Sequence, residues 1–144
     1  MKIPAARRND LDAIRALLAE NDLPTSDVDA SLLNDFLVAE DASGALVGSI
    51  GLERFGSTAL LRSLAVAQTA RNGGLGSNLL SQAESLARES GVSELWLLTT
   101  TAADFFRRAG YAEVDRSRAS AELQSSTQFA ELCPATAVCM KKRL

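Results

Sequence analysis

Three glycines, Gly73, Gly74 and Gly76, stand within four positions, between an apolar segment and an amphipathic one. The apolar segment at residues 58–66 is typical of a strand. After the glycines, apolar residues recur at helical spacing, which predicts a helix that begins near Gly74 and stops at Gly91. A glycine beside a helix costs roughly 1 kcal/mol relative to alanine, so three at one helix start require a physical reason. A strand, a loop and a helix in this order indicate a right-handed crossover to a parallel strand.

The parallel partner is predicted to be SELWLLTT, residues 93–100, because this segment is too apolar to have a solvated face. The half of the chain before the glycines is expected to be antiparallel, with a hairpin turn at Gly56 and Ser57. Its predicted strands are FLVAE (36–40), ALVGSIGLERF (45–55) and TALLRSLAV (58–66).

The remaining elements have weaker signals. Asn9 or Asp10 can cap a first helix, and Asn21 and Pro24 stop it. The other expected elements are a short strand at 2–5, a second helix at about 26–34, a short helix at 102–110, strands at 111–115 and 135–142, and weak helical segments between about 118 and 132. Together they predict one α/β or α+β domain, residues 1–144, around a mixed, strongly twisted sheet.

Composition excludes several classes of function. The net charge is −3 and no basic run exceeds the terminal KKR, so a nucleic-acid partner is not expected. No apolar stretch reaches the roughly 18 residues that span a bilayer, and residues 1–10 lack the apolar centre of a signal peptide. We therefore expect no membrane partner and a cytoplasmic location. Histidine is absent, which excludes Ser-His-Asp chemistry, and no metal site is expected. Cys133 and Cys139 are interpreted as small buried residues, with a reactive thiol as the alternative.

The glycine loop has two interpretations. The first turn of a helix attracts phosphate through its unpaired N–H groups, and glycines let a bulky anion approach them. The alternative is a tight turn that only packs the helix. A P-loop is excluded because Ser77 and Asn78 follow Gly76 where Lys and Ser or Thr are needed, and the dinucleotide pattern fails at Leu79. The pattern that fits is R-x-x-G-x-G at residues 71–76.

With this motif the chain resembles the GCN5-related N-acetyltransferases (GNAT), which hold the pyrophosphate of acetyl-coenzyme A (acetyl-CoA) on such a loop. LAVAQTARNGGLGSNLL (64–80) is similar to the family's strand, loop and helix, and LWLLTTTAADFFRRAGY (95–111) to its second cofactor segment. The small arsenic-resistance N-acetyltransferases share LTTTA, FF and a tail like FAELCPATAVCM. The acetyltransferase domain of bacterial N-acetylglutamate synthase is similar in RNGG and LTT.

The resemblance implies a GNAT-like sheet of about six to seven strands with helices on both faces. Its parallel strands 4 and 5, ending at Val66 and Thr99, would splay apart to admit acetyl-CoA as co-substrate. The backbone of Leu64 and Val66 would pair with the pantetheine arm, and an N–H near Leu64 would polarise the thioester carbonyl. The loop residues whose amides would bind the pyrophosphate are Arg71, Asn72, Gly73, Gly74, Leu75, Gly76 and Ser77.

The catalytic groups do not carry over from the family. The family's usual tyrosine acid falls at Phe106, its usual asparagine at Thr99, and the carboxylate base of some members at Leu60. Glu53 is therefore the preferred candidate for a base acting through water, and Thr99, or else Thr100 or Thr101, for a weak proton donor. A Glu53 without a catalytic role is the alternative. Tyr111 could donate a proton, but a core position is the competing interpretation.

Arg62 and Arg54 are the candidate substrate-binding residues. By strand alternation, Arg62 shares a face with Leu60, Leu64 and Val66. A guanidinium among apolar neighbours needs a partner. That partner is either a substrate carboxylate, bound in a bidentate fork, or an internal carboxylate such as Glu53 or Asp35.

These features predict an N-acetyltransferase that moves the acetyl group of acetyl-CoA to a primary amine of a small, amino-acid-like molecule. The amine would attack directly in a ternary complex. The resemblance leaves a role in resistance to arsenic compounds or toxic amino-acid analogues open. The alternative is a non-catalytic acyl-CoA-binding or sensing domain on the same fold. A homodimer is also left open, because no sequence feature bears on it.

Overall fold

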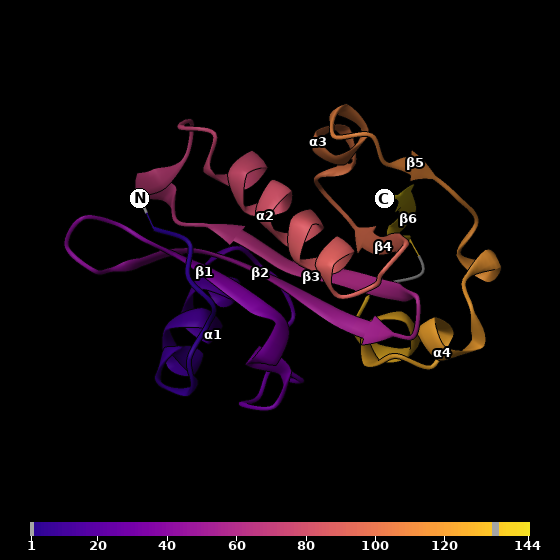
Figure 1. Ribbon diagram of the computed structural model, residues 1–144, viewed down its shortest axis with the longest axis horizontal. Coiled ribbons are helices and arrows are strands. Elements are labelled where there is room, and N and C mark those ends of the chain that lie inside the picture. Colours follow the sequence, from indigo (N-terminus) through magenta and orange to yellow (C-terminus); the bar gives the residue numbers. More distant parts are fainter. Residues whose placement is uncertain (1, 134–135) are drawn as a thin grey trace.

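The fold is built around one open sheet, which has six strands in the described part of the chain (Figure 1). The computed structural model describes residues 2–133 and 136–144. The strands are β1 (Phe36–Glu40), β2 (Leu46–Phe55), β3 (Thr58–Val66), β4 (Glu94–Thr99), β5 (Ala112–Glu113) and β6 (Val138–Arg143). They lie in the order β1-β2-β3-β4-β6-β5, with β3 and β4 parallel and the other neighbours antiparallel. The predicted mixed α/β architecture is confirmed.

Helices cover both faces of the sheet. They are α1 (Leu11–Glu20), α2 (Leu75–Glu89), α3 (Ala103–Arg108) and α4 (Ala121–Gln124), and a π-helical turn spans Gln128–Leu132. In Figure 1, α2 and α3 lie on the upper side of the strands, and α1 and α4 lie on the lower side. Short 3-10 turns occupy Arg8–Asp10, Leu32–Asp35, Gln68–Ala70 and Arg116–Arg118. None of the helices in the described segments combines the length and apolar character that a membrane span requires.

α2 forms where the glycine pattern predicts it. Gly74 precedes its first residue with φ +78°, and Gly91 follows its end with φ +85°, which is the left-handed region that glycine adopts without strain. Between them, the apolar stripe that includes Leu75, Leu79 and Ala83 is buried against the sheet. This packing fixes the start of α2 next to the end of β3.

β3 and β4 separate after a short parallel contact. Their paired residues run from Thr58 with Glu94 to Leu60 with Trp96, whereas the two strands continue to Val66 and Thr99. β4 pairs with β6 along its whole length, so the sheet continues on that side. The predicted divergence of the parallel strands is confirmed, and it leaves a gap beside the second half of β3.

A β-bulge lies in the second half of β3. Opposite β2, Arg62 pairs with Gly51 and Ala65 pairs with Ser49, so Ser63 and Leu64 together face one residue of β2. Ser63 has φ +59°, a conformation that costs about 1–3 kcal/mol in a non-glycine residue. The buried Ser49 hydroxyl donates to the Ser63 carbonyl oxygen at 2.8 Å and thereby holds the bulge.

The bulge changes which side chains share a face. Leu60 packs with Trp96 under α4, and Arg62 keeps the same parity, but Leu64 and Val66 contact the cluster under α2. The prediction that Arg62 shares a face with Leu64 and Val66 is therefore wrong. The extra residue reverses the alternation of side chains, and nothing in the apolar pattern of 58–66 indicated it.

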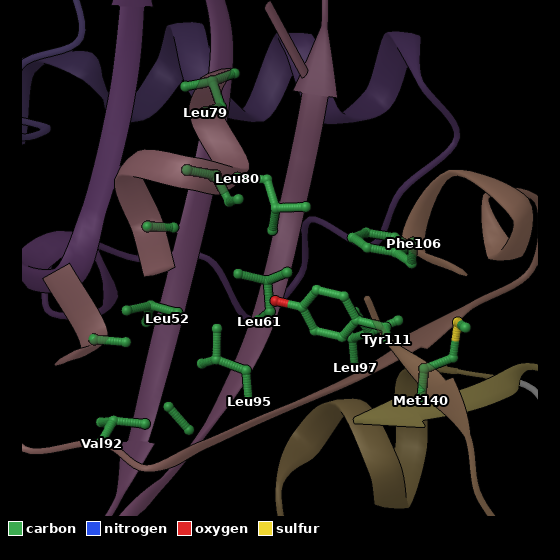
Figure 2. Close-up of a cluster of buried hydrophobic side chains, with 14 of the residues drawn as sticks. Leu52, Leu61, Leu79, Leu80, Val92, Leu95, Leu97, Phe106, Tyr111 and Met140 are labelled. Carbon is green, nitrogen blue, oxygen red and sulfur yellow. The ribbon is translucent and has the colours of Figure 1, made fainter. Parts of the chain in front are cut away.

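Three apolar clusters form the core. The largest lies between the sheet and α2 with α3, and Figure 2 shows Leu61, Leu97 and Met140 of the strands beside Phe106 and Tyr111. A second cluster lies under α1 and includes Phe36. The Phe36 ring covers Gly51, where an added Cβ would lie 2.1 Å from it, so a glycine is required at that position. The third lies under α4 and includes Leu60 and Trp96.

Some predicted elements differ from the observed ones. The segment 2–5 makes two isolated bridges, Lys2 with Glu40 and Ala5 with Leu37, because Pro4 lacks the N–H that a ladder needs. The predicted helix at 26–34 is absent from the described chain except for its end in the 3-10 turn. There the Asp29 carboxylate accepts bonds from Ser31 and from the Leu32 N–H, a local arrangement that competes with a helix.

The C-terminal third is also less regular than predicted. The strand predicted at 111–115 is reduced to the two residues of β5. The strand predicted at 135–142 is observed as β6, and its predicted first residue, Ala135, lies outside the described residues.

Candidate active site

A cavity of about 330 Å³ lies where β3 and β4 separate. Its walls come from the end of β3, the end of β4 with the loop that follows, the loop after α1, and the π-helical turn. Leu64 and Thr99, from the two diverging strands, both line it. The parallel strand pair thus opens toward the same end of the sheet at which the glycine loop begins.

The glycine loop presents free backbone to the outside. Asn72 and Gly74 have φ +70° and +78°, and an added Cβ at Gly73 or Gly74 would meet no atom within 4 Å. Within the described residues, the first backbone hydrogen bond of α2 is donated by the Asn78 N–H to the Gly74 carbonyl oxygen at 3.0 Å. The amides of 72–77 are therefore not used by the fold.

Arg71 anchors this loop through its side chain. Its Nε donates to the Val66 carbonyl oxygen at 3.1 Å, and a terminal nitrogen donates to Asn21 Oδ1 at 2.7 Å. Its own N–H points back to the Gln68 carbonyl oxygen at 3.4 Å. Of the predicted amide donors, Arg71 is thus engaged in the turn, and the accessible donors begin at Asn72.

These features fit a diphosphate with an extended thiol arm. The 15-residue α2 directs its positive end at the loop, and among the described residues no atom lies within 4 Å of an added Cβ at Gly73 or Gly74. A Cβ added at Gly76 would lie 3.6 Å from the Phe105 ring, which is an ordinary packing distance. Glycine is therefore not sterically required at position 76. The cavity between β3 and β4 lies at the end of β3 from which this loop follows.

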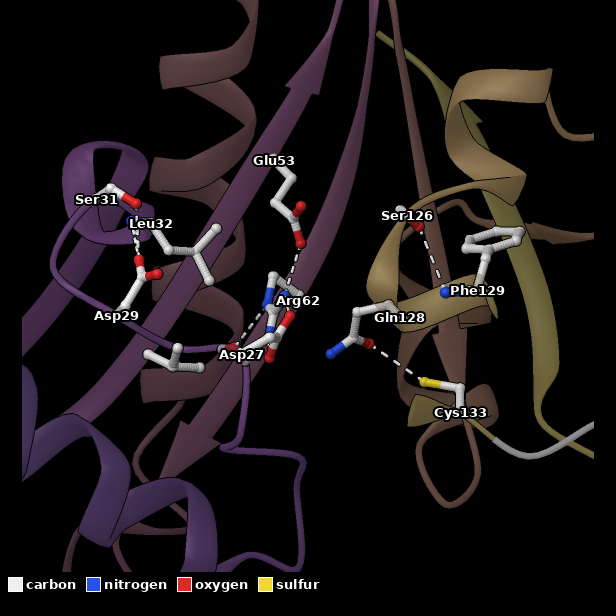
Figure 3. Close-up of polar contacts among 12 residues, drawn as sticks. Asp27, Asp29, Ser31, Leu32, Glu53, Arg62, Ser126, Gln128, Phe129 and Cys133 are labelled. Carbon is white, nitrogen blue, oxygen red and sulfur yellow. Dashed lines mark hydrogen bonds and ion pairs between the residues drawn. The ribbon is translucent and has the colours of Figure 1, made fainter. Parts of the chain in front are cut away.

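Arg62 is the centre of an ion-pair cluster beside the cavity (Figure 3). Its guanidinium donates to Asp27 at 2.5 and 2.7 Å, to Glu53 at 2.6 Å and to the Ser63 hydroxyl at 3.2 Å. Burial opposes its charge, but the bonds to Asp27 and Glu53 outweigh burial and raise the pKa of Arg62. The side chain of Arg62 is 0% exposed, whereas those of Asp27 and Glu53 are 15% and 19% exposed.

The internal partner proposed for Arg62 is therefore present, and it consists of Glu53 together with Asp27. Arg54 is separate from this cluster: its Nε donates to Asp35 at 3.0 Å, and its side chain is 46% exposed. The structure does not bring Arg54 and Arg62 together into one anion-binding fork. What reaches the surface around Arg62 is carboxylate oxygen rather than guanidinium.

Of the two candidate catalytic residues, Thr99 lines the cavity, whereas Glu53 lies behind Arg62. Glu53 is tied to Arg62 through Oε1, which leaves Oε2 without a partner in the described chain. Thr99 lines the cavity, and its Oγ1 accepts a hydrogen bond from the Ala102 N–H at 3.0 Å. Phe106 lines the same cavity as an apolar ring, so the position of the family's usual tyrosine carries no proton donor.

Tyr111 is a core residue. It is 3% exposed, its ring packs edge-on against Phe106, and its hydroxyl donates to Glu84 Oε2 at 2.9 Å. Burial raises the pKa of Tyr111 far above its usual value. Lys142 donates to the same Glu84 oxygen at 3.0 Å, so the hydroxyl belongs to a structural network.

Three residues of the site were not anticipated from the sequence. Asp27 lies 35 positions before Arg62, and no spacing rule predicts their contact. Gln128 and Cys133 both line the cavity, and the Cys133 thiol donates to Gln128 Oε1 at 3.2 Å. Their five-residue separation matches one π-helical turn, which an α-helical reading of this segment does not place on one face. Cys139, in contrast, is buried in the core as predicted.

The fold and the cavity define a small α/β domain with a diphosphate-type loop at a gap between parallel strands. A family model described as an acetyltransferase (GNAT) domain matches residues 33–113, more than half of the chain. The chain belongs to the GNAT acetyltransferase family. The predicted family is thus confirmed, while its arsenic-resistance subgroup is not.

Individual relatives cover the chain to different extents. An uncharacterized N-acetyltransferase of Chlorobaculum tepidum is 38% identical over 85 residues, which are 58% of this chain and 54% of that protein. An amino-acid acetyltransferase of Pseudomonas putida is 48% identical over 52 residues, 36% of this chain and 12% of that protein. The chain therefore spans about half or less of these curated relatives.

Solved structures agree with the fold. The Mycobacterium tuberculosis protein Rv2747, in complex with CoA, superposes with a TM-score of 0.83 at 22% identity, covering 100% of this chain and 99% of that one. N-acetylglutamate synthase from Neisseria gonorrhoeae, complexed with coenzyme A and N-acetyl-glutamate, gives 0.85 at 23% identity, covering 99% of this chain and 35% of that one.

Proposed function

We propose that the chain transfers the acetyl group of acetyl-CoA to a primary amine of a small, amino-acid-like molecule in a ternary complex. The observation that carries this proposal is the alignment of two features: unused amides at 72–77, and a cavity that opens between β3 and β4 beside them. A diphosphate on the amides would direct an extended thiol arm along the free edge of β3.

Acetyl-CoA supplies an activated acyl group as a thioester, which an amine with a free lone pair attacks. The chain's task is to hold both reactants and to accept a proton from the ammonium. Ser63 and Leu64, the two residues at the bulge, line the cavity, and we assign the N–H near Leu64 to the thioester carbonyl oxygen. Glu53 Oε2 is free to accept the proton through water.

The absence of a tyrosine at Phe106 is compatible with this chemistry. The departing thiolate resembles that of cysteine, whose pKa is about 8.5, so protonation adds only modest help near neutral pH. The Thr99 hydroxyl is the candidate for a weak donor, since its oxygen already accepts from Ala102 and its proton is directed elsewhere.

The amino-acid-like acceptor is supported by names of related proteins. The Pseudomonas putida relative is named an amino-acid acetyltransferase, and the N-acetylglutamate synthase structure, which has the same fold, holds N-acetyl-glutamate with coenzyme A. An organoarsenical or other toxic amino-acid analogue is a member of the same substrate class. A role for such analogues is supported only by the sequence similarity to the arsenic-resistance N-acetyltransferases.

A sensing domain that binds acyl-CoA without turnover is the second candidate. The observation that favours it is Phe106, an apolar ring at the position of the family's usual acid. The discriminating experiment measures free thiol released from acetyl-CoA across a panel of amino acids and simple amines. Amine-dependent thiol release supports the transferase. Binding of acetyl-CoA without amine-dependent release supports the sensor and contradicts the proposed function.

A further inference from the structure

Gln128 is a buried side chain with one end unused. It is 7% exposed and lines the cavity, and its Oε1 accepts the hydrogen bond from the Cys133 thiol. Among the described residues, no atom accepts a hydrogen bond from Gln128 Nε2. In Figure 3 this nitrogen points away from Cys133, on the side of Arg62 and Asp27. Among the described residues, no fully covered side-chain nitrogen or oxygen lacks a partner, so Gln128 Nε2 keeps accessible surface at the cavity. A ligand oxygen in the cavity can accept a hydrogen bond from it.

The thiol defines which end of the amide faces the cavity. Burial raises the pKa of the Cys133 thiol, so the group stays protonated near neutral pH and acts as a donor. The observed contact has this donor 3.2 Å from the amide oxygen of Gln128. The nitrogen is then directed into the cavity with its two N–H groups.

Carboxylates gather on the Arg62 side of the cavity. Asp22 lines the cavity, and Asp27 and Glu53 keep part of their surface free around the fully covered Arg62. A second guanidinium, that of Arg116, lies at the Cys133 end of the cavity, where it donates to the Cys133 carbonyl oxygen at 3.3 Å. The carboxylates on the Arg62 side therefore favour a cation such as an ammonium at that end. An oxygen of the same ligand, in contrast, finds Gln128 as its hydrogen-bond donor.

We infer that Gln128 is the specificity-determining residue for the acceptor, and that it selects primary amines carrying a carboxyl or carbonyl oxygen. This inference rests on the proposed function. The ammonium lies toward the Asp27–Glu53 side, and the oxygen accepts from Gln128 Nε2. Cys133 is a positioning residue that acts through the amide oxygen of Gln128.

The test compares three arms in the thiol-release assay: L-methionine, L-methioninamide and the decarboxylated amine 3-(methylthio)propylamine. We expect the wild type to show a KM about tenfold lower for the first two, the equivalent of one hydrogen bond. Gln128→Glu and Gln128→Met should remove this preference by raising the KM of L-methionine and L-methioninamide toward that of the decarboxylated amine. Gln82→Glu, an exposed glutamine on α2, is the matched control and should change nothing.

Cys133 gives an independent readout. Cys133→Ala should raise the KM of L-methionine without lowering kcat. Cys133→Ser replaces the thiol donor with a hydroxyl donor, so its KM for L-methionine should stay close to the wild-type value. Equal KM values in all three arms, or a preference that survives both Gln128 substitutions in proteins with unchanged melting temperature, overturn the inference while the transferase stands. Acetyl-CoA binding without thiol release in any arm overturns the proposed function and the inference together.

Discussion

Arg62 limits what the acceptor side of the cavity can bind. Its buried guanidinium spends four N–H groups on Asp27, Glu53 and Ser63, so a substrate carboxylate would have to displace bonds that already satisfy a buried charge. The exposed parts of the cluster are the carboxylates. At the scale of single residues, the cluster is thus better suited to an ammonium than to an anion.

Glu53→Gln tests whether this carboxylate accepts the proton. The amide can still accept a bond from Arg62 but is a poor base, so we expect kcat to fall roughly 100-fold at neutral pH. Asp35→Asn is the control, because its carboxylate pairs with Arg54 outside the cavity. Steady-state thiol release with a fixed amine measures both. Equal activity of the two variants would assign Glu53 to structure alone.

Tyr111→Phe tests the assignment of Tyr111 to the core rather than to catalysis. Removing the hydroxyl leaves Glu84 with Lys142, which should cost about 1 kcal/mol of unfolding free energy in urea. Because the folded pKa of Tyr111 is raised, the bond contributes fully below the unfolded value of about 10 and is lost only above it, so the penalty stays constant from pH 6 to 9. We expect kcat within about twofold of wild type. A tenfold loss of kcat would make Tyr111 catalytic.

At the scale of elements, the bulge in β3 is what brings Leu64 to the cavity. Ser49→Ala removes the buried bond to the Ser63 carbonyl and should cost about 1 kcal/mol of stability. It should also weaken acetyl-CoA binding, because the strained bulge loses its support. Ser81→Ala, exposed on α2, is the control. Calorimetric titration that finds unchanged affinity, with unchanged urea stability, would mean that the bulge does not depend on Ser49.

The sequence predicts elements well where one local rule dominates. Gly74 and Gly91 delimit α2, and Gly56 turns the hairpin, because left-handed backbone favours glycine in each case. Prediction fails where local hydrogen bonds compete with a helix, as at Asp29. It also fails where the pairing of two strands decides the backbone conformation, as at Ser63. A serine at a bulge looks like any other strand residue until its partner strand is known.

For the whole molecule, the two halves of the site differ in how far they can be predicted. The cofactor half lies within one continuous segment, β3 to α2, so a sequence motif can predict it. The acceptor half joins Asp27, Glu53, Arg62 and Gln128 from separate elements, and only the folded chain brings them together. Sequence reasoning therefore gave candidates for that half but not its partners.

The most direct test of the account is calorimetric binding of acetyl-CoA to wild type and Gly73→Val. Position 73 has open space for a side chain and no positive φ, unlike Gly74, so valine there should leave the ligand-free melting temperature within about 2 °C. Thr69→Val, exposed before the loop, is the control. The account predicts that Gly73→Val weakens binding at least tenfold while Thr69→Val does not. Equal affinity in all three proteins would contradict binding of the diphosphate by the amides of 72–77.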